Sequence, residues 1–269
     1  MDHELWFECC AGFQCECARN EYDGYFDRND FKPDLDKSIR NAVDTQTLEH
    51  KWQMLVSSYA MKAQHLTFAD DIFPALQGIA KIVPPIMGAY LAGHWAKHLD
   101  KSLCWYHNPN ATRASKTRAW RAPSWSWASV SGYVKWQIHS GLWDGNDEQM
   151  HMFITVVEVT TSPVGWDPTG QLLSGTIKLV GQCLPGEVAW AYSRRTSDEP
   201  TCFIIFNKGP EEFSTRLSHD HRRYVYWDYL VHEPGPYQVS NGASVVILRL
   251  NCTQGGERAW MILKLSMER

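Results

Sequence analysis

The spacing of hydrophobic residues changes near residue 130, and this change limits the possible folds more than any other feature of the chain. Before it, apolar residues recur at helical spacing; after it, short runs of β-branched and aromatic residues alternate with turn residues. We therefore predict an α+β protein, with an N-terminal helical layer packed on a C-terminal, mainly antiparallel β-sandwich or open barrel. The two segments are 1–130, mostly helical, and 131–269, rich in strands, and we expect one compact unit.

The first segment predicts three helices. One runs from about 44 to 61, where Asp44 can cap the first turn and the apolar residues form a single stripe. A second, short helix begins near Asp71 and ends at a pair of prolines. A third spans about 86–99. The residues of the first stripe are Leu48, Trp52, Leu55, Val56 and Tyr59.

The second segment predicts at least seven strands. The connections between them are too short for crossover helices, so antiparallel pairing is expected. Asn241–Gly242 and the stretch 165–170 have the composition of turns. The predicted strands are 133–138, 152–159, 176–180, 202–206, 224–229, 245–250 and 260–265.

Charge and composition exclude several classes of protein. The chain has 26 Lys and Arg against 30 Asp and Glu, so it lacks the basic stripe of a nucleic-acid-binding protein. The longest apolar stretch, 79–92, is interrupted by Lys81 and two prolines and cannot form the ~20-residue helix that spans a bilayer. The N-terminus is acidic where a signal peptide would be basic, so we expect no secretory signal. We expect a cytoplasmic protein whose eight cysteines are thiols.

No cofactor or metal site is predicted. The chain contains no GxSxG elbow, no SxxK motif and no glycine loop of the P-loop or Rossmann type. Three clusters have a functional and a simpler interpretation. The cysteines at 9, 10, 15 and 17 could bind zinc, although adjacent cysteines suit one tetrahedral ion poorly, or could be plain thiols. His94 and His98 resemble half a zinc motif on the third predicted helix, or a hydrated face. His219–Asp220–His221 could be functional or a polar loop.

Aromatic residues are the compositional anomaly, with 13 Trp, 11 Tyr and 10 Phe. They indicate either a large core or a pocket lined with indole faces. The densest stretch is 120–129, WRAPSWSWAS. In an extended chain Trp125 and Trp127 would share one face. The stretch is then either a strand entering the core, or an aromatic wall with Arg121 as a charged donor.

These residues carry a resemblance to a known family. Residues 121–130, RAPSWSWASV, match a signature of fungal heterokaryon-incompatibility (HET) proteins. Upstream, 66–80 resembles their "LT…D.LPALSGIA" segment and 90–105 their "YLAGLW…L…LLW" segment. Residues 6–9 resemble "FWEC", and the first predicted helix fits "W..LV..Y". The resemblance covers residues 4–132 in order and is only general from 133 onward.

The N-terminal block that defines HET proteins has no counterpart in this sequence. That block carries the "Y.ALSY.WG" and "W.DALCIDQ" motifs and is thought to form a TIR-like signalling fold. The resemblance therefore implies a scaffold, a fungal source and an intracellular setting, and it does not carry over the cell-death activity residue by residue.

Two functions are compatible with these observations. The first is a cofactor-independent enzyme of fungal secondary metabolism, a cyclase or pericyclase of the Diels–Alder type that folds an apolar polyene or terpenoid in an aromatic pocket. Arg121 and Asp228 would be its catalytic residues. Its substrate-binding residues would be Trp105, Trp120, Ser124, Trp125, Trp127 and Tyr226. The alternative is a truncated HET-type protein that acts as a non-enzymatic interaction module, with a protein partner, in fungal cell death.

Overall fold

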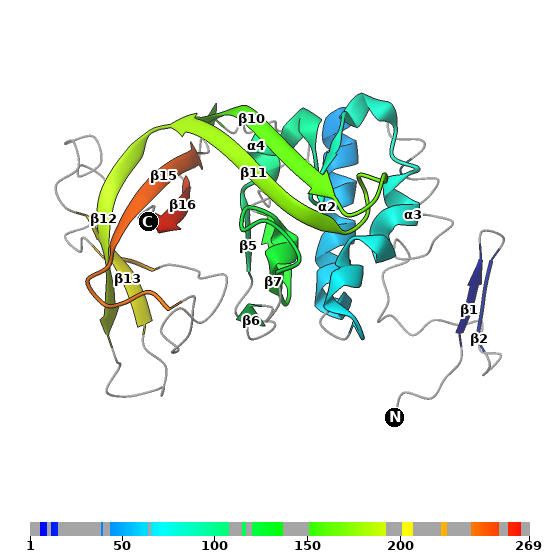
Figure 1. The fold of residues 1–269 in the computed structure, drawn as a ribbon, viewed down its shortest axis with the longest axis horizontal. Coiled ribbons are helices and arrows are strands. Elements are labelled where there is room, and N and C mark those ends of the chain that lie inside the picture. Colours follow the sequence, from blue (N-terminus) through cyan, green and yellow to red (C-terminus); the bar gives the residue numbers. More distant parts are fainter. Residues whose placement is uncertain are drawn as a thin grey trace, which may run out of the picture.

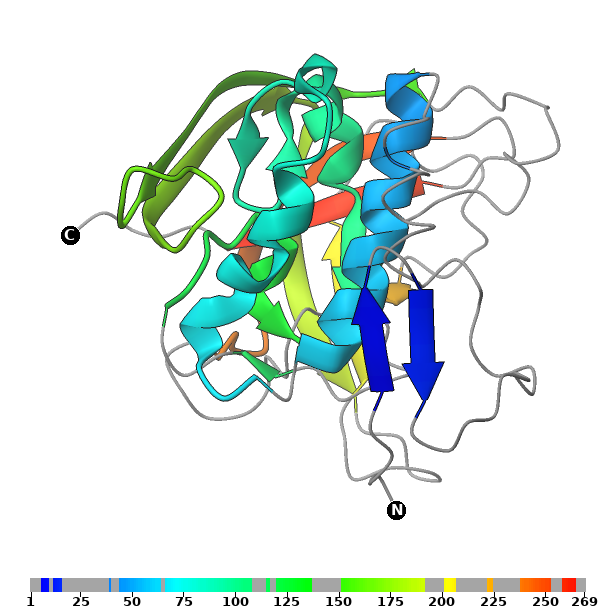
Figure 2. The same ribbon diagram turned by 90° about the vertical axis from the view of Figure 1, so that its right-hand side faces the viewer.

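The computed structural model shows a helical region joined to a six-stranded sheet by a long β-hairpin (Figure 1). In the orthogonal view the six-stranded sheet lies behind the helices (Figure 2). The structure describes residues 6–9, 12–15, 39, 44–63, 66–107, 115–116, 120–136, 151–191, 201–206, 222–224, 238–252 and 258–264. The predicted class, α+β with mainly antiparallel strands in the C-terminal part, is confirmed, and the sheets of the described residues are open rather than closed into a barrel.

The helical region contains one long helix and several single turns. The α-helices are α2 (Thr45–Ala63), α3 (Gln77–Ala80) and α4 (Leu99–Ser102). The 3₁₀ turns are η2 (Ala69–Ile72), η3 (Pro74–Leu76), η4 (Pro85–Met87), η5 (Ala96–His98) and η6 (Trp127–Ser129).

The strands pair antiparallel throughout the described residues. Five two-stranded pairs are β1 (Trp6–Cys9) with β2 (Gly12–Cys15), β3 (Tyr90–Leu91) with β4 (His94–Trp95), β5 (Trp105–His107) with β8 (Val134–Trp136), β6 (Ser115–Lys116) with β7 (Val130–Ser131), and β10 (Ile154–Pro163) with β11 (Leu172–Gly181). The large sheet has the order β14 (Arg222–Tyr224), β13 (Thr201–Phe206), β12 (Cys183–Ala191), β15 (Ser244–Cys252), β16 (Arg258–Lys264), and β9 (His151–Met152) pairs with β15.

The first predicted helix is confirmed as α2. The Asp44 carboxylate accepts a hydrogen bond from the Thr47 backbone N–H at 2.7 Å, which satisfies one of the free amides of the first turn. Of the predicted stripe, Leu48, Trp52 and Val56 are buried and the other two residues are half-buried. The second predicted helix is present as the successive turns η2, η3 and α3.

The third predicted helix, 86–99, is wrong. The chain forms the β3–β4 hairpin there, because Ala92 and Gly93 have φ values of 49° and 92°. Two consecutive residues with positive φ make the tight turn whose twist suits a two-residue hairpin loop. Helical apolar spacing was present in the sequence, but the turn conformation at Ala92–Gly93 prevents a continuous helix.

Most of the predicted strands are confirmed, but of 224–229 only residue 224 is described, and several short strands and the nine-residue β12 were not predicted. Strands β10 and β11 each have 10 residues and are longer than predicted. Asn241–Gly242 is a turn, closed by a 3.0 Å hydrogen bond from the Ala243 N–H to the Ser240 carbonyl. Strand β12 was not predicted, because Pro185 and Gly186 interrupt its pattern of β-formers.

A single hydrophobic cluster joins the helices to the long hairpin and to β15. It contains residues of α2 and the β3–β4 hairpin together with Ile154, Leu172, Leu248 and Leu250. The curved β10–β11 ribbon spans the distance from the six-stranded sheet to α3 (Figure 1). Glycine at position 175 in β11 lets the ribbon pass close over Pro123, since a Cβ there would overlap the proline ring.

Candidate functional site

Three of the segments named from sequence meet at the carbonyl group of Gly93. This oxygen accepts hydrogen bonds from the indole N–H of Trp52, at 2.8 Å, and from that of Trp127, at 3.1 Å. Glycine is required at position 93 for two reasons: its φ is positive, and a Cβ there would overlap the Trp127 ring. We call the buried residues around this oxygen the tryptophan junction: Trp52, Tyr90, Gly93, Trp95, Trp125 and Trp127.

Apart from Trp125, which lies tilted against His94, the aromatic rings of the junction pack edge to face, the geometry that aromatic quadrupoles favour. Trp52, Tyr90 and Trp95 contact one another with centroid distances of 5.2 to 5.9 Å. Phe73 and Tyr59 pack on Trp127 at 6.1 and 6.2 Å. The junction therefore ties α2, the β3–β4 hairpin and the 123–130 loop into one packed unit.

The 123–130 loop turns instead of running straight. Ser126 donates from its hydroxyl to the Ala92 carbonyl at 2.7 Å and accepts from the Ala128 N–H at 3.1 Å, which starts η6. The expectation that Trp125 and Trp127 share a face of an extended chain is thus wrong. The small hydroxyl of Ser126 satisfies backbone groups at the start of the turn, as a helix cap does.

Arg121 is buried and donates to the backbone of the same loop. Its Nε donates to the Ala128 carbonyl at 2.6 Å and one Nη donates to the Val130 carbonyl at 2.8 Å. Burial lowers the pKa of the guanidinium, and Tyr59 and Asp70 counteract this. The fork of the guanidinium holds the end of the loop in place.

The remaining predicted site residues lie in two different environments. Trp105 is half-buried and donates its indole N–H to the Trp125 carbonyl at 2.9 Å, so the structure brings Trp105, Trp125 and Trp127 together. Trp120, 49 % exposed, and Ser124 lie at the surface. Asp228 and Tyr226 fall outside the described residues, and their predicted roles stay predictions.

A groove of about 420 Å³ lies between the helical region and the hairpin. None of the predicted substrate-binding residues lines it. Six of its eight lining side chains are apolar and the others are a carboxylate and a hydroxyl, but polar atoms make up about half of the exposed wall. The lining residues are Leu91, Ala96, Leu99, Asp100, Ile154, Thr155, Val156 and Val159.

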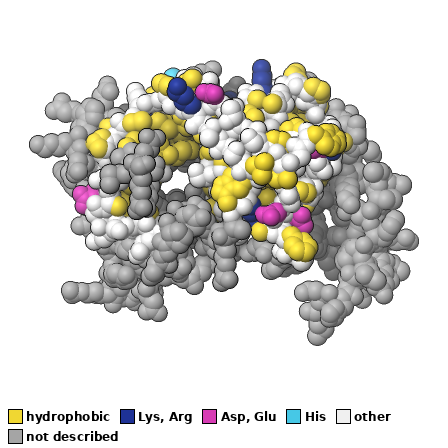
Figure 3. All heavy atoms as spheres, in the orientation of Figure 1, with side chains coloured by type: hydrophobic (Ala, Val, Ile, Leu, Met, Phe, Trp, Pro, Cys, Tyr) yellow, Lys and Arg dark blue, Asp and Glu magenta, His cyan; other side chains and the backbone are white. Residues whose placement is uncertain are grey.

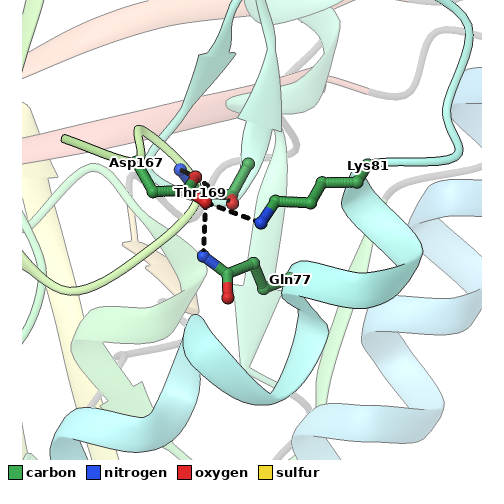
Figure 4. Close-up of polar contacts among 4 residues, drawn as sticks. All are labelled: Gln77, Lys81, Asp167 and Thr169. Carbon is green, nitrogen blue, oxygen red and sulfur yellow. Dashed lines mark hydrogen bonds and ion pairs between the residues drawn. The ribbon is translucent and has the colours of Figure 1, made fainter.

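The tip of the β10–β11 hairpin is a second site, and only its turn was predicted. Trp166 is 90 % exposed there, flanked by the exposed side chains of Val164 and Leu173. The next residue, Asp167, fastens the tip to the helical region. It lies 2.7 Å from the Lys81 ammonium and accepts a 2.7 Å hydrogen bond from the Gln77 amide (Figure 4).

Asp167 also orders its own turn. Its second oxygen accepts from the Thr169 backbone N–H at 2.9 Å and from the Thr169 hydroxyl at 2.5 Å. Lys81 and then Thr169 lower the pKa of the carboxyl to about 2. We call Gln77, Lys81, Asp167 and Thr169 the clasp. The turn signal at 165–170 predicted the loop, but no sequence signal linked it to α3, which lies about 90 positions earlier.

Of the three clusters named from sequence, only the histidine pair is described in full, and His94 is buried rather than on a hydrated helix face. His94 lies in β4 and bonds to the Ser102 hydroxyl at 2.6 Å, whereas His98 lies in η5 and bonds to Thr45 at 2.9 Å, so they do not share a helix face. Cys9 and Cys15 lie at opposite ends of the β1–β2 register. Cys10 and Cys17, and the whole of 219–221, fall outside the described residues.

Comparison with known proteins leaves the chain without an assigned relative. No family model matches it, and no curated protein or solved structure does. Within the described residues, no helix is long and apolar enough to cross a membrane.

Proposed function

We propose that the chain is a non-enzymatic interaction module of the heterokaryon-incompatibility type, and that the β10–β11 tip is its contact element. The observation that carries this proposal is Trp166, an indole held almost fully in solvent by a turn that the clasp fixes. Tryptophan is enriched among residues that dominate binding energy at protein interfaces. A contact residue on a fixed turn also loses little conformational freedom when a partner binds.

The surroundings of Trp166 support this role. Apolar side chains are exposed along the hairpin at Val157, Val164, Leu173 and Val180. Figure 3 shows that hydrophobic side chains on the face it draws are scattered over the helical side and the sheet side, and are not confined to the hairpin. Exposed apolar patches on a protein surface often mark interaction sites.

The tryptophan junction also supports the proposal, because its polar groups take part in structural hydrogen bonds. The indole N–H groups of Trp52, Trp105 and Trp127 donate to backbone carbonyls, as does the Arg121 guanidinium. These signature residues build the scaffold on which the hairpin rests, since β11 passes directly over Pro123. The RAPSWSWASV motif then explains the fold, and the hairpin supplies the contact surface.

The test is forced expression in a filamentous fungus, alone and beside a full-length HET protein, scored as growth rate. We expect the chain to change the growth arrest caused by the full-length protein, and Trp166→Ala to abolish this effect. The matched control is Trp120→Ala, which removes an exposed indole outside the hairpin. Normal growth with the unaltered chain in both settings, or an equal loss with Trp120→Ala, would overturn the proposal.

A second candidate function is the cofactor-free cyclase, and the groove is the observation that favours it. Its volume of about 420 Å³ lies in the range of small-molecule sites, roughly 300–1,000 Å³, and six of its eight lining side chains are apolar. Purified protein would be mixed with polyene aldehydes, and the rate and stereochemistry of cyclisation compared with buffer. Thr155→Phe narrows the groove and should abolish any acceleration, whereas Thr160→Phe, on the same strand but outside the groove, should not. A product distribution equal to that in buffer would remove this candidate.

A further inference from the structure

The turn that leads into β15 contains the only asparagine of the chain that a glycine follows, Asn241–Gly242. Gly242 has a φ of 81°, whereas the φ of Asn241 is not positive. A turn with a positive φ only at its third residue is of type II, and glycine suits that position. Both residues are exposed, so water reaches them.

An asparagine followed by glycine can lose its side-chain amide without an enzyme. The backbone nitrogen of Gly242 gives up its proton to base and attacks the side-chain carbonyl carbon of Asn241. The bond from that carbon to the side-chain nitrogen breaks, and ammonia leaves. Water then opens the five-membered imide at either carbonyl, which gives aspartate or isoaspartate at 241. Glycine hinders the attack least because it has no Cβ.

The attacking nitrogen is held in a hydrogen bond to β12. The Gly242 N–H donates to the Val188 carbonyl at 2.7 Å, and the Val188 N–H donates to the Ala243 carbonyl at 2.9 Å. The Ala243 N–H donates to the Ser240 carbonyl at 3.0 Å and closes the turn. The proton that base must remove is therefore bonded to a neighbouring strand.

The acceptor strand is itself fixed in the sheet. The Val188 side chain is 0 % exposed, and Val188 pairs with Ile204 of β13 on the other edge of β12. Closing the imide ring requires the Gly242 nitrogen to rotate about the Asn241 Cα–C bond toward the Cβ of Asn241. A type II turn holds this bond rotated away from that position. The reaction therefore needs the turn to separate from β12.

We propose that Asn241 is a deamidation site that its pairing with β12 keeps closed, so that the reaction marks molecules in which this part of the sheet has opened, and that the product carboxylate weakens the same pairing. Hydrogen exchange at Gly242 removes the same proton, and hydrogen-bonded amides exchange when the structure opens locally. Exchange and deamidation are therefore controlled by one opening step.

The product is expected to destabilise the turn because a carboxylate already lies there. Glu187 Oε1 is 3.4 Å from the point where a Cβ on Gly242 would lie. Hydrolysis places a second carboxylate at 241, and like charges on neighbouring strands destabilise their pairing. Isoaspartate also adds one carbon to the backbone of the turn, which changes the spacing of its bonds to Val188.

The first experiment uses the unaltered full chain and needs no variant to fold. The protein is kept at pH 8, folded in buffer or unfolded in urea, and deamidation at 241 is followed by mass spectrometry of the peptide that contains it. We expect the folded chain to react more slowly, by at least the factor by which folding slows exchange of the Gly242 amide proton. Equal rates in the two states would overturn the proposal, as would an unfolded chain that does not react at 241.

The second experiment changes how often the turn opens. Val188→Ala removes buried methyl groups from β12 and should speed deamidation of the folded chain. The matched control is Val157→Ala on β10, where the valine is 54 % exposed, and it should react like the unaltered chain. Equal rates in these two variants would show that pairing with β12 does not control the reaction.

The third experiment isolates the effect of the product. Asn241→Asp carries the product charge from the start, and we expect its unfolding constant in urea at pH 8 to be about two- to fivefold higher than that of the unaltered chain. Adding Glu187→Gln to the same chain should remove the difference, because the two carboxylates no longer face each other. Unchanged stability of Asn241→Asp would overturn the proposed weakening of the sheet.

Discussion

Trp127 and Trp166 are the same side chain in opposite environments. Trp127 is 1 % exposed, donates to the Gly93 carbonyl and lies against Phe73 and Tyr59. Trp166 is 90 % exposed at the end of a hairpin that a surface ion pair fastens. Trp127 is therefore part of the packed core, whereas the side chain of Trp166 extends from the hairpin turn into solvent.

The difference shows what an excess of tryptophan means in this chain. Burying an indole removes a large apolar area from water, so the tryptophan junction stabilises the fold. An indole left in water contributes little to stability, so the fold alone does not account for the position of Trp166. Substitutions at the two sites should therefore separate effects on stability from effects on partner binding.

The largest expected effect is that of Trp127→Ala. The change leaves a cavity beside Phe73 and Tyr59 and removes a donor from the Gly93 carbonyl, and large-to-small changes of this kind cost about 3–5 kcal/mol. Urea unfolding followed by circular dichroism measures it. Trp166→Ala is the matched control, with an expected change within about 0.5 kcal/mol. An equal loss of unfolding free energy in Trp127→Ala and Trp166→Ala would contradict the assignment of Trp127 to the core and of Trp166 to the contact surface.

Arg121→Met should have the next largest effect. The methionine fills part of the volume but leaves the Ala128 and Val130 carbonyls without their donors, and a hydrogen bond to a charged group contributes about 1.5–3 kcal/mol. Arg121→Lys keeps the charge and loses the fork, so it should restore only part of the loss. Full stability of Arg121→Met would show that the loop does not need the guanidinium, and would leave Arg121 free for the catalytic role suggested by sequence.

Local patterns predicted the elements whose stability is local. Helix α2 was visible because its apolar stripe, its cap at Asp44 and its length agree. Most long strands of the second segment, β12 excepted, were visible because β-branched residues and turn residues alternate there. The predicted helix 86–99 failed where two left-handed residues, Ala92 and Gly93, override helical spacing.

The candidate sites depend on contacts between distant residues, which no local pattern records. The RAPSWSWASV motif directed attention to Trp125 and Trp127, but its hydrogen bonds to the 92–93 turn could not be seen from spacing. The clasp joins residues about 90 positions apart.

The smallest expected effect on global stability is that of Asp167→Asn, and it tests whether the tip is held in place. The asparagine oxygen can still accept from Thr169, but its amide nitrogen then faces the donors of Gln77 and Lys81, so the clasp opens while the turn survives. Hydrogen exchange at the backbone amides of 164–171 should become faster, with exchange in α2 unchanged.

The same opening should occur in the unaltered protein under acid conditions. The pKa of Asp167 is lowered to about 2, so the clasp is complete above the ordinary aspartate value of 3.8 and its contribution is lost as pH falls toward 2. Exchange at the tip that is the same in Asp167→Asn and in the unaltered chain would show that packing of β11 on Pro123, rather than the clasp, positions Trp166.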